Sequence, residues 1–186
     1  MADPTPQTDC HGETIASTCP PTTEEGRRPS FSRLAGLLLA LVILIADRVS
    51  KLWFLAHWRD AGVLTLAPVL DFRLVWNPGI SLGLLQDGGT AITVVTALIT
   101  AAVAVWLWRV RDRGEALALG LVLGGALGNL WDRLHYGAVV DFVHFHVGDW
   151  SFYVFNLADA ALSVGAGAMI LLSLRQMRRA GRQQPG

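Results

Sequence analysis

The chain has 186 residues, of which 52% are hydrophobic and only 16% are charged, and its formal net charge at pH 7 is zero. Its mean hydropathy of +0.42 means that it holds more apolar material than a soluble domain of this length can bury, which argues against an ordinary globular protein and favours an integral membrane protein. The zero net charge gives no electrostatic reason to expect a nucleic-acid partner.

Residues 1–30 are rich in Pro, Thr, Ser and Glu and contain little apolar material, which is typical of a disordered tail. Both cysteines of the chain, Cys10 and Cys19, lie in this tail. Since the predicted helices contain no cysteine with which to build a disulfide framework, we expect free thiols without a catalytic role. The first apolar run begins at Leu34 without a small-residue cleavage site after it, so we expect a retained membrane anchor.

Four apolar segments follow the tail, and each is expected to form a transmembrane helix. They are residues 34–53, 90–108, 116–131 and 154–174. A hydrocarbon core of about 30 Å requires about 20 residues at about 1.5 Å per residue. The second and fourth segments meet this length directly, whereas the first and third meet it only when their polar ends belong to the helix.

Clusters of arginine predict how these helices are oriented. Three precede the first segment, three occupy the loop between the second and third, and four follow the fourth: Arg27, Arg28, Arg33, Arg109, Arg111, Arg113, Arg175, Arg178, Arg179 and Arg182. Because positively charged flanks stay in the cytoplasm, both termini are expected to be cytoplasmic. We therefore expect a cytoplasmic tail (1–30), a four-helix membrane domain (31–175) and a basic cytoplasmic tail (176–186).

Two longer segments, residues 54–89 and 135–153, then face outward. Each contains a stretch of alternating apolar and polar residues, 70–75 and 139–146, that is typical of a short strand. The predicted fold class is an all-α membrane protein with four transmembrane helices. A small extracytoplasmic β element lies between helices 1 and 2, and a short loop or strand lies between helices 3 and 4.

The polar residues of the helices are predicted to lie at one depth, near the outer face. The first and third helices run outward and carry these residues late, whereas the fourth runs inward and carries them early. Ionisable groups at such a depth are unfavourable unless they are paired or hydrated, so they indicate a functional site. Three pairs share a helix face by their spacing: Asp47 and Lys51, Asn129 and Arg133, and Asn156 and Asp159.

Two of the charged sets also permit a purely structural role. Asp47 with Lys51, and Asp132 with Arg133, are each neutral as a pair and suit ion pairs that hold helices together. The third helix carries small residues that predict close packing against a neighbour: Gly124, Gly125 and Gly128.

Asp141 and Asp159 differ from these pairs. Asp159 has no basic residue within one turn of its own helix, and Asp141 follows helix 3 at the same level. Two carboxyl groups held close together cannot both ionise easily, so one keeps a proton while the other stays charged. Such a pair can activate a water molecule and protonate a leaving amine. By spacing alone, the alternative that the two aspartates are unrelated stays open.

Three blocks of sequence follow one another over more than thirty residues: Gly125-Ala-Leu-Gly-Asn129-Leu-Trp-Asp132-Arg133, Gly137-Ala-Val-Val-Asp141-Phe142 and Phe155-Asn156-Leu-Ala-Asp159. They resemble the GN–DR, G-x-V-x-DF and FN-x-AD pattern of the lipoprotein signal peptidase (signal peptidase II) family. Two further blocks, Asp47-Arg-Val-Ser-Lys51 and Asn77-Pro-Gly79, are similar to that family's D-Q-x-S-K and N-x-G. The resemblance covers roughly residues 34–175.

The resemblance implies an aspartic peptidase whose catalytic pair falls on Asp141 and Asp159. It implies supporting or substrate-binding roles for Asp47, Lys51, Asn77, Gly79, Asn129, Arg133 and Asn156. The implied reaction removes signal peptides from bacterial prolipoproteins, by cleavage just before a diacylglyceryl-modified cysteine, and no metal or organic cofactor is implied. We expect lipid-modified prolipoproteins and membrane lipids as partners, a monomer, and a location in the bacterial inner membrane.

The chain departs from the family pattern at two places. Arg48 stands where the family usually has Gln, which puts a positive charge near the site. Ser81-Leu82 follows Ile80 where the family often has Ala-Phe, which makes the assignment of Asn77 weaker than that of the aspartates.

Two other functions compete with the peptidase. His144 and His146 would point to one side of a strand, with Asp141 and Asp149 nearby, and zinc enzymes use such ligands; however, the sequence has no H-E-x-x-H motif. A transport or binding role for the intramembrane charges is the non-enzymatic alternative. The internal repeats and midplane site expected of a transporter are absent from the sequence.

Overall fold

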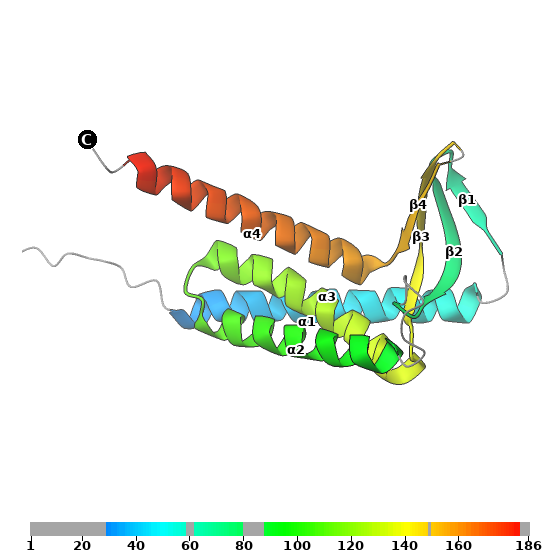
Figure 1. Cartoon of the computed structure of the whole chain (residues 1–186), viewed down its shortest axis with the longest axis horizontal. Helices are drawn as coiled ribbons and strands as arrows, with labels where there is room; N and C mark the ends of the chain where they lie inside the picture. The colour runs from blue at the N-terminus through cyan, green and yellow to red at the C-terminus, as the bar shows by residue number, and fades with distance from the viewer. Residues whose placement is uncertain (1–28, 59–61, 80–87, 149, 183–186) are drawn as a thin grey trace, which may run out of the picture.

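The computed structural model describes residues 29–58, 62–79, 88–148 and 150–182. Its helices run alongside one another, and an antiparallel sheet stands at one end of them (Figure 1). The elements are α1 (Pro29–His57), β1 (Leu64–Ala67), β2 (Leu70–Asn77), α2 (Gly88–Arg109), α3 (Arg113–Tyr136), β3 (Val139–Val147), β4 (Trp150–Phe155) and α4 (Leu157–Arg182). The predicted disordered tail with its two cysteines, and the Ser81-Leu82 departure, lie outside the described residues.

Three of these helices, α2, α3 and α4, are long and apolar enough to cross a membrane. The described part of α1 differs in composition, because Arg33 lies near its start and Asp47, Arg48 and Lys51 lie toward its end. Its long outward face is nevertheless apolar, and the exposed side chains include Leu38, Val42 and Val49. The four predicted helices are therefore present, and three have the composition of a membrane span.

Local capping interactions set the ends of α3. The side chain of Asp112 accepts a hydrogen bond of 3.0 Å from the backbone of Glu115, as an N-cap. At the other end, Gly137 adopts a positive φ of 73° and its N–H donates to the carbonyl of Arg133 at 3.1 Å. The helix is therefore longer at both ends than the predicted segment 116–131.

The prediction that residues 154–174 form one continuous helix is wrong at its start. Val154 pairs with His144 in the sheet, and Phe155 is the last residue of β4. The helix α4 begins only at Leu157. An apolar run does not distinguish the end of a buried strand from the start of a membrane helix.

The strands form one antiparallel sheet in the order β1-β2-β3-β4. The two predicted strand stretches, 70–75 and 139–146, are confirmed as parts of β2 and β3, and they pair directly, with Val75 opposite Asp141. The strands β1 and β4 were not predicted. The sheet is anchored to α1 by Phe142 of β3, whose ring stacks on Phe54 with centroids 4.0 Å apart. The two segments that were predicted to face outward thus form one sheet.

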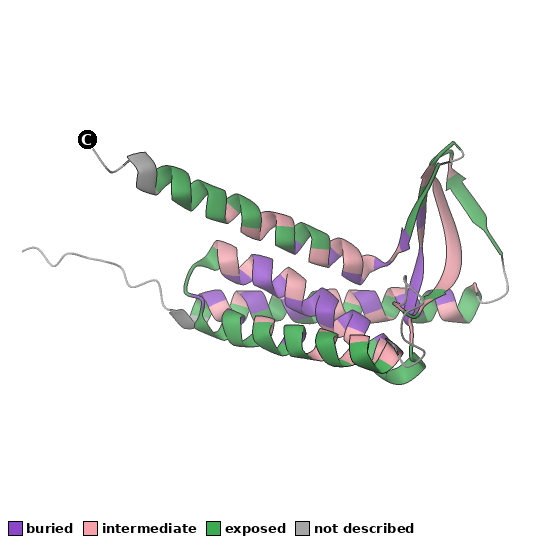
Figure 2. Cartoon of the chain, in the orientation of Figure 1, coloured by how far each residue is buried: buried purple, intermediate pink, exposed green. Residues whose placement is uncertain are grey.

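The helix α3 lies at the centre and packs against α1, α2 and α4. Buried residues concentrate along it (Figure 2). Its glycines allow this close packing, because an added Cβ at Gly124 would lie 2.6 Å from the carbonyl oxygen of Ala40, and one at Gly125 would lie 2.5 Å from that of Ala158. At Gly128 the added atom would lie 2.4 Å from a carboxylate oxygen of α1. The predicted close contact of these three glycines is confirmed.

Substitution of Gly120 by Ala is expected to destabilise this packing. The added Cβ would lie 2.4 Å from the backbone oxygen of Gly36, which cannot turn away as a side chain can. We expect a loss of about 1–3 kcal/mol, typical of an overpacked core, measured by thermal unfolding in detergent. Gly167→Ala is the matched control, since nothing lies within 4 Å of its added Cβ. Equal stability of the two variants would contradict this account.

Candidate active site

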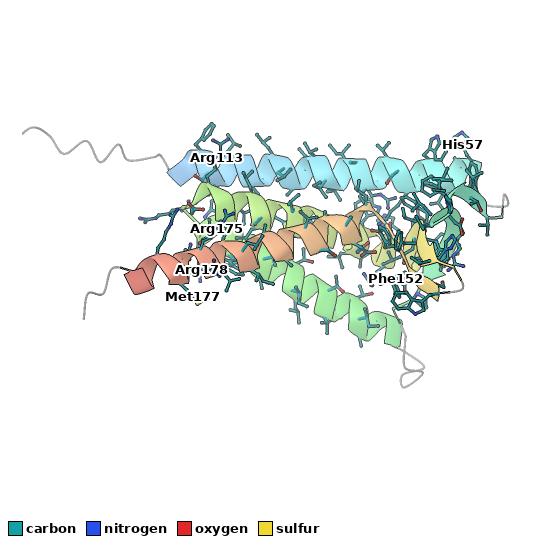
Figure 3. All side chains as sticks on the ribbon, turned by 90° about the horizontal axis from the view of Figure 1, so that it is seen from above. His57, Arg113, Phe152, Arg175, Met177 and Arg178 are labelled. Carbon is teal, nitrogen blue, oxygen red and sulfur yellow. The ribbon has the colours of Figure 1, made fainter. Side chains whose placement is uncertain are left out.

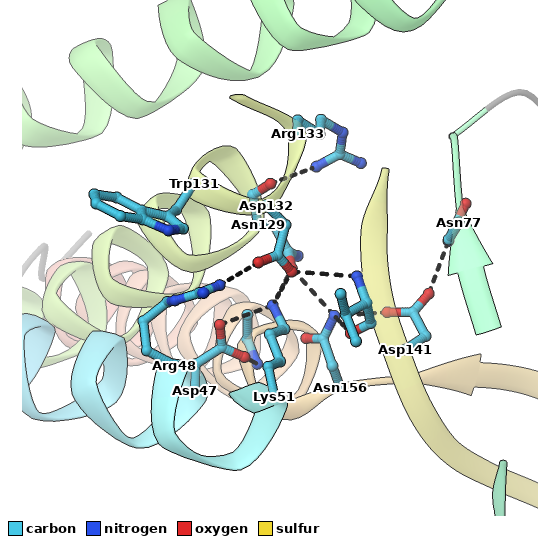
Figure 4. Close-up of polar contacts among 12 residues, drawn as sticks. Asp47, Arg48, Lys51, Asn77, Asn129, Trp131, Asp132, Arg133, Asp141 and Asn156 are labelled. Atoms are coloured by element: carbon cyan, nitrogen blue, oxygen red, sulfur yellow. Dashed lines mark hydrogen bonds and ion pairs between the residues drawn. The ribbon is translucent and has the colours of Figure 1, made fainter. Parts of the chain in front are cut away.

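A buried cluster of charges joins α1 to α3 (Figure 4). Lys51, the only lysine of the chain, is fully buried. Its Nζ lies 2.8 Å from Asp47 Oδ2 and 2.8 Å from Asp132 Oδ2, and it donates a hydrogen bond of 3.2 Å to Asn129 Oδ1. These three acceptors match the three donors of an ammonium group. The predicted pairing of Asp47 with Lys51 is confirmed.

Arg48 completes this cluster from the same helix. Its Nη1 pairs with Asp132 Oδ1, so the positive charge that distinguishes this chain from the family pattern is neutralised. The alternative that Asp132 pairs with Arg133 is not borne out, because neighbouring residues on a helix point in different directions. Asp132 instead faces α1, and it also accepts a hydrogen bond of 3.2 Å from the backbone of Val140 in β3.

Two asparagines connect the charge cluster to the predicted catalytic aspartates. Asn129, which accepts from Lys51, donates its amide to Asp159 Oδ1 at 2.7 Å. Asn156 donates to Asp141 Oδ1 at 2.6 Å and to Asn129 Oδ1 at 3.1 Å. One hydrogen-bond network therefore links Asp141, from β3, with Asp159, from α4.

The start of α4 aims Asp159 by a local reciprocal cap. The side chain of Asn156 accepts from the backbone N–H of Asp159 at 3.0 Å, and the carboxylate of Asp159 accepts from the N–H of Asn156 at 3.3 Å. Ala158 N in the same turn donates to Asp47 Oδ1 at 3.0 Å. This arrangement is a capping box, and the spacing of three residues between Asn156 and Asp159 is what it requires.

Asn77 holds the other oxygen of Asp141 from the end of β2. Its Nδ2 donates to Asp141 Oδ2 at 3.0 Å and to the hydroxyl of Tyr153 at 2.7 Å. Its own Oδ1 accepts from Gly79 N at 2.9 Å, and Gly79 takes a positive φ of 75° that favours glycine. Tyr153 was not predicted, because it lies on the unpredicted strand β4.

Arg133 and Asp159 face a cavity of about 670 Å³ between α3, α4 and the sheet. The wall is part polar and part apolar, and the apolar side chains on it include Val139, Phe155 and Val164. Arg133 is held by a hydrogen bond of 3.3 Å from its Nη1 to the carbonyl of Asn129. A cavity of this size with a few convergent polar groups is typical of a binding site for an organic ligand.

Asp141 does not line this cavity, but it accepts a hydrogen bond from Asn77, which does. It lines a second cavity of about 310 Å³, and Asn77 and Tyr153 belong to the walls of both cavities. The structure therefore brings together all of the predicted site residues, with Asp141 and Asp159 at the centre. Asp47 and Lys51 are the most remote, and hydrogen bonds connect them to Asn129 and to the start of α4.

The environment of Asp141 makes it a candidate acid or base. Its side chain is 1% exposed, and this burial is the main reason why the pKa of Asp141 rises from 3.8 to about 6. The nearby carboxylate of Asp159 raises the pKa further, whereas the hydrogen bonds from Asn77 and Asn156 lower it. A carboxyl group with a pKa near neutrality can both hold and release a proton under working conditions.

His144 and His146 do share one face of β3, as the alternation predicted, and their rings stack with centroids 5.3 Å apart. Asp141 is an odd number of residues away on the same strand, so it points to the opposite face. The carboxylate beside the two histidines is that of Asp71 in β2, which was not predicted. Asp149 lies outside the described residues.

Comparison with known proteins places this geometry in context. The family model described as Signal peptidase (SPase) II matches residues 39–175. The chain is 49% identical over 154 residues to the lipoprotein signal peptidase of Methylorubrum extorquens (strain PA1), which covers 78% of this chain and 89% of that protein. It is 44% identical over 155 residues to the lipoprotein signal peptidase of Methylocella silvestris, and this match covers 80% of the present chain and 91% of that protein. A bacterial membrane enzyme solved by the in meso method at 1.9 Å resolution has a similar fold, with a TM-score of 0.69 and a sequence identity of 27%. The match covers 75% of the present chain and 92% of that enzyme.

Proposed function

The chain belongs to the signal peptidase II family, and we propose that it is a membrane-embedded aspartic endopeptidase that removes signal peptides from diacylglyceryl-modified prolipoproteins. The observation that carries the aspartic mechanism is the hydrogen-bond network that links Asp159, on the larger cavity, to Asp141, on a second cavity that shares Asn77 and Tyr153 as wall residues. The protein acts as a monomer in the bacterial inner membrane.

The two aspartates divide the proton transfers between them. Asp159 lines the cavity and takes a proton from the attacking water, while Asp141, whose pKa is raised, gives a proton to the carbonyl oxygen of the scissile bond. When the tetrahedral intermediate collapses, the C–N bond breaks. Asp141 then recovers its proton from the hydroxyl group, and Asp159 passes its proton to the leaving amine. No covalent intermediate and no metal takes part.

The remaining site residues support this chemistry. Asn129 and Asn156 orient the two carboxyl groups, and Asn77 holds Asp141 from the sheet. Arg133 is placed on the cavity wall, where its guanidinium group can bind the backbone of the substrate. Lys51 fixes the position of Asn129. Two further residues support the site by hydrogen bonds that involve backbone N–H groups. The N–H of Gly79 donates to Asn77, and Asp47 accepts from the N–H of Ala158 in α4.

All four helices cross the membrane, with the sheet and the site outside. Arg113, Arg175 and Arg178 lie at one end of the helices, whereas His57 and Phe152 lie at the other (Figure 3), and the arginine end is cytoplasmic by the distribution of positive charge. In a chain without Cys10 and Cys19, an impermeant thiol reagent applied outside is expected to label Val147→Cys but not Arg111→Cys. Labelling of the second variant alone would reverse the orientation.

The decisive experiment is cleavage of a purified diacylglyceryl-modified prolipoprotein by the purified chain in detergent. We expect cleavage just before the lipid-bearing cysteine, unaffected by EDTA and by serine-directed covalent inhibitors. A peptide carrying a non-hydrolysable hydroxyl group at the scissile position should inhibit, because it resembles the tetrahedral transition state. Cleavage lost in EDTA and restored by zinc would exclude the aspartic mechanism.

Asn77→Ala is expected to move the basic limb of the pH profile of kcat/KM to higher pH. The Asn77 hydrogen bond stabilises the charged form of Asp141 and lowers its pKa, so its loss raises that pKa and keeps Asp141 protonated to higher pH. We expect a shift of about one pH unit, since one unit corresponds to about 1.4 kcal/mol and a hydrogen bond to a charged group contributes about 1.5–3 kcal/mol. Tyr153→Phe, which leaves the Asn77–Asp141 bond in place, should shift it less. A basic limb at unchanged or lower pH contradicts this assignment.

A further inference from the structure

Three metal-ligating side chains converge on the face of the sheet that points away from Asp141. Asp71 of β2 is the cross-strand partner of His144 in β3, and His146 follows two residues along. Asp71 Oδ2 lies 3.4 Å from His144 Nδ1 and 3.0 Å from His146 Nε2, and all three ligand atoms lie within 4.8 Å of one another. The side chains are largely buried, with 13%, 7% and 21% of Asp71, His144 and His146 exposed.

A serine contacts one ring nitrogen of His144, and the other ring nitrogen faces Asp71. The hydroxyl of Ser151 lies 2.7 Å from His144 Nε2 and 3.3 Å from the carbonyl oxygen of Phe152, so it can accept from Nε2 while it donates to that carbonyl. A neutral His144 protonated at Nε2 has its lone pair on Nδ1. In that tautomer the lone pair faces an oxygen of Asp71, which is the arrangement that two ligands of one cation require.

Two further donor atoms of the cluster lack hydrogen-bond partners among the described residues. His146 Nε2 lies 3.0 Å from the same oxygen, yet it has no hydrogen-bond partner among the described residues, and neither has Asp71 Oδ1. One carboxylate oxygen of Asp71 therefore lies close to a ring nitrogen of each histidine. Around a tetrahedral zinc ion with bonds of about 2.0–2.1 Å, neighbouring ligand atoms lie about 3.3 Å apart, close to both observed separations.

We infer that Asp71, His144 and His146 form a binding site for a zinc-type divalent ion, distinct from the catalytic pair. Two imidazoles and one carboxylate suit zinc and leave a fourth position for water. Ser151 is the outer partner that orients His144 as a ligand. This site departs from the absence of a metal implied by the family resemblance.

The ion would brace the sheet rather than take part in the reaction. It would link β2 to β3, the two strands that carry Asn77 and Asp141 into the site. Because it binds the folded sheet, zinc should raise the unfolding temperature of the chain. Cleavage should persist without it, so this inference stands or falls independently of the proposed function.

Zinc binding is best measured by competition with a chromophoric chelator, using the full chain in detergent. The parent chain for these measurements carries Cys10→Ser, His11→Ala and Cys19→Ser, since thiols and imidazole in the tail also bind zinc. We expect one zinc ion per chain. A parent that binds no zinc in competition with the chelator would overturn the proposal.

Variants of the ligands then locate the ion. Asp71→Asn and His146→Ala should each weaken zinc binding at least 100-fold, and Ser151→Ala should weaken it by about 10–100-fold through the loss of an outer partner. His135→Ala removes an exposed histidine elsewhere and serves as the matched control, with unchanged affinity. Affinity that is equal in Asp71→Asn, His146→Ala and the control would overturn the proposal.

A footprint on the unsubstituted histidines keeps the test valid if a ligand variant fails to fold. Diethyl pyrocarbonate modifies accessible imidazoles, and mass spectrometry identifies which ones. Zinc should protect His144 and His146 at least tenfold while leaving His57 and His135 as reactive as before. Equal reactivity of all four histidines with and without zinc would show that the ion does not bind there.

Discussion

Asp141→Asn and Asp159→Asn are each expected to reduce prolipoprotein cleavage by at least about 10³-fold, within the range of about 10²–10⁴-fold for the loss of a positioned acid or base. Asn keeps the size of the side chain but can neither take nor give the proton. The variants should still fold, because the network around the two carboxyl groups consists of uncharged asparagine partners. Cleavage is measured as the initial rate of signal-peptide release, alongside thermal unfolding.

Asp71→Asn is the matched control for this pair. Asp71 lies in the same sheet and is also a largely buried carboxylate, but it lines neither of the two cavities. The variant Asp71→Asn should therefore cleave at the rate of the parent. A rate within about tenfold of the parent for either Asp141→Asn or Asp159→Asn would remove that residue from the catalytic pair, since a positioned acid or base contributes at least about 10²-fold.

Lys51→Met is expected to have the largest effect on stability. The substitution keeps an unbranched side chain but removes the ammonium group that lies between Asp47 and Asp132, both of which are fully buried. Arg48 still pairs with Asp132, but Asp47 loses the one ion pair that it has among the described residues. Breaking a buried ion pair from one side costs about 3–5 kcal/mol, so we expect a much lower unfolding temperature in detergent and little protein in the membrane.

A second substitution tests whether uncompensated charge is the cause. Lys51→Met combined with Asp47→Asn removes one of the two carboxylates, and it should recover part of the lost stability because the two positions are directly coupled. Arg178→Ala, on the exposed end of α4, is the control and should be neutral. If the double variant is no more stable than Lys51→Met, packing rather than charge accounts for the loss.

Much of this protein could be predicted from the sequence because the signals are local or depend only on chain direction. Runs of about 20 apolar residues predict membrane helices, and alternating polarity predicted the strands β2 and β3. The alternating direction of successive helices predicted that polar residues near the ends of α1 and α3 lie beside those near the start of α4. The contacts of Lys51 with Asn129 and of Asp47 with Ala158 confirm this prediction. The spacing of Asn156 and Asp159 already contains the capping box that aims the carboxylate.

Only the tertiary structure decided which groups pair across elements. Asp132 adjoins Arg133 in the sequence, yet it binds Lys51 and Arg48, because side chains one position apart on a helix diverge. The pairing of β2 with β3, more than sixty residues apart in the chain, brings Asn77 to Asp141 and Asp71 to the two histidines. The start of α4 was predicted wrongly for the same reason. Whether an apolar residue extends a strand or begins a helix depends on the presence of a partner strand, which the local sequence does not reveal.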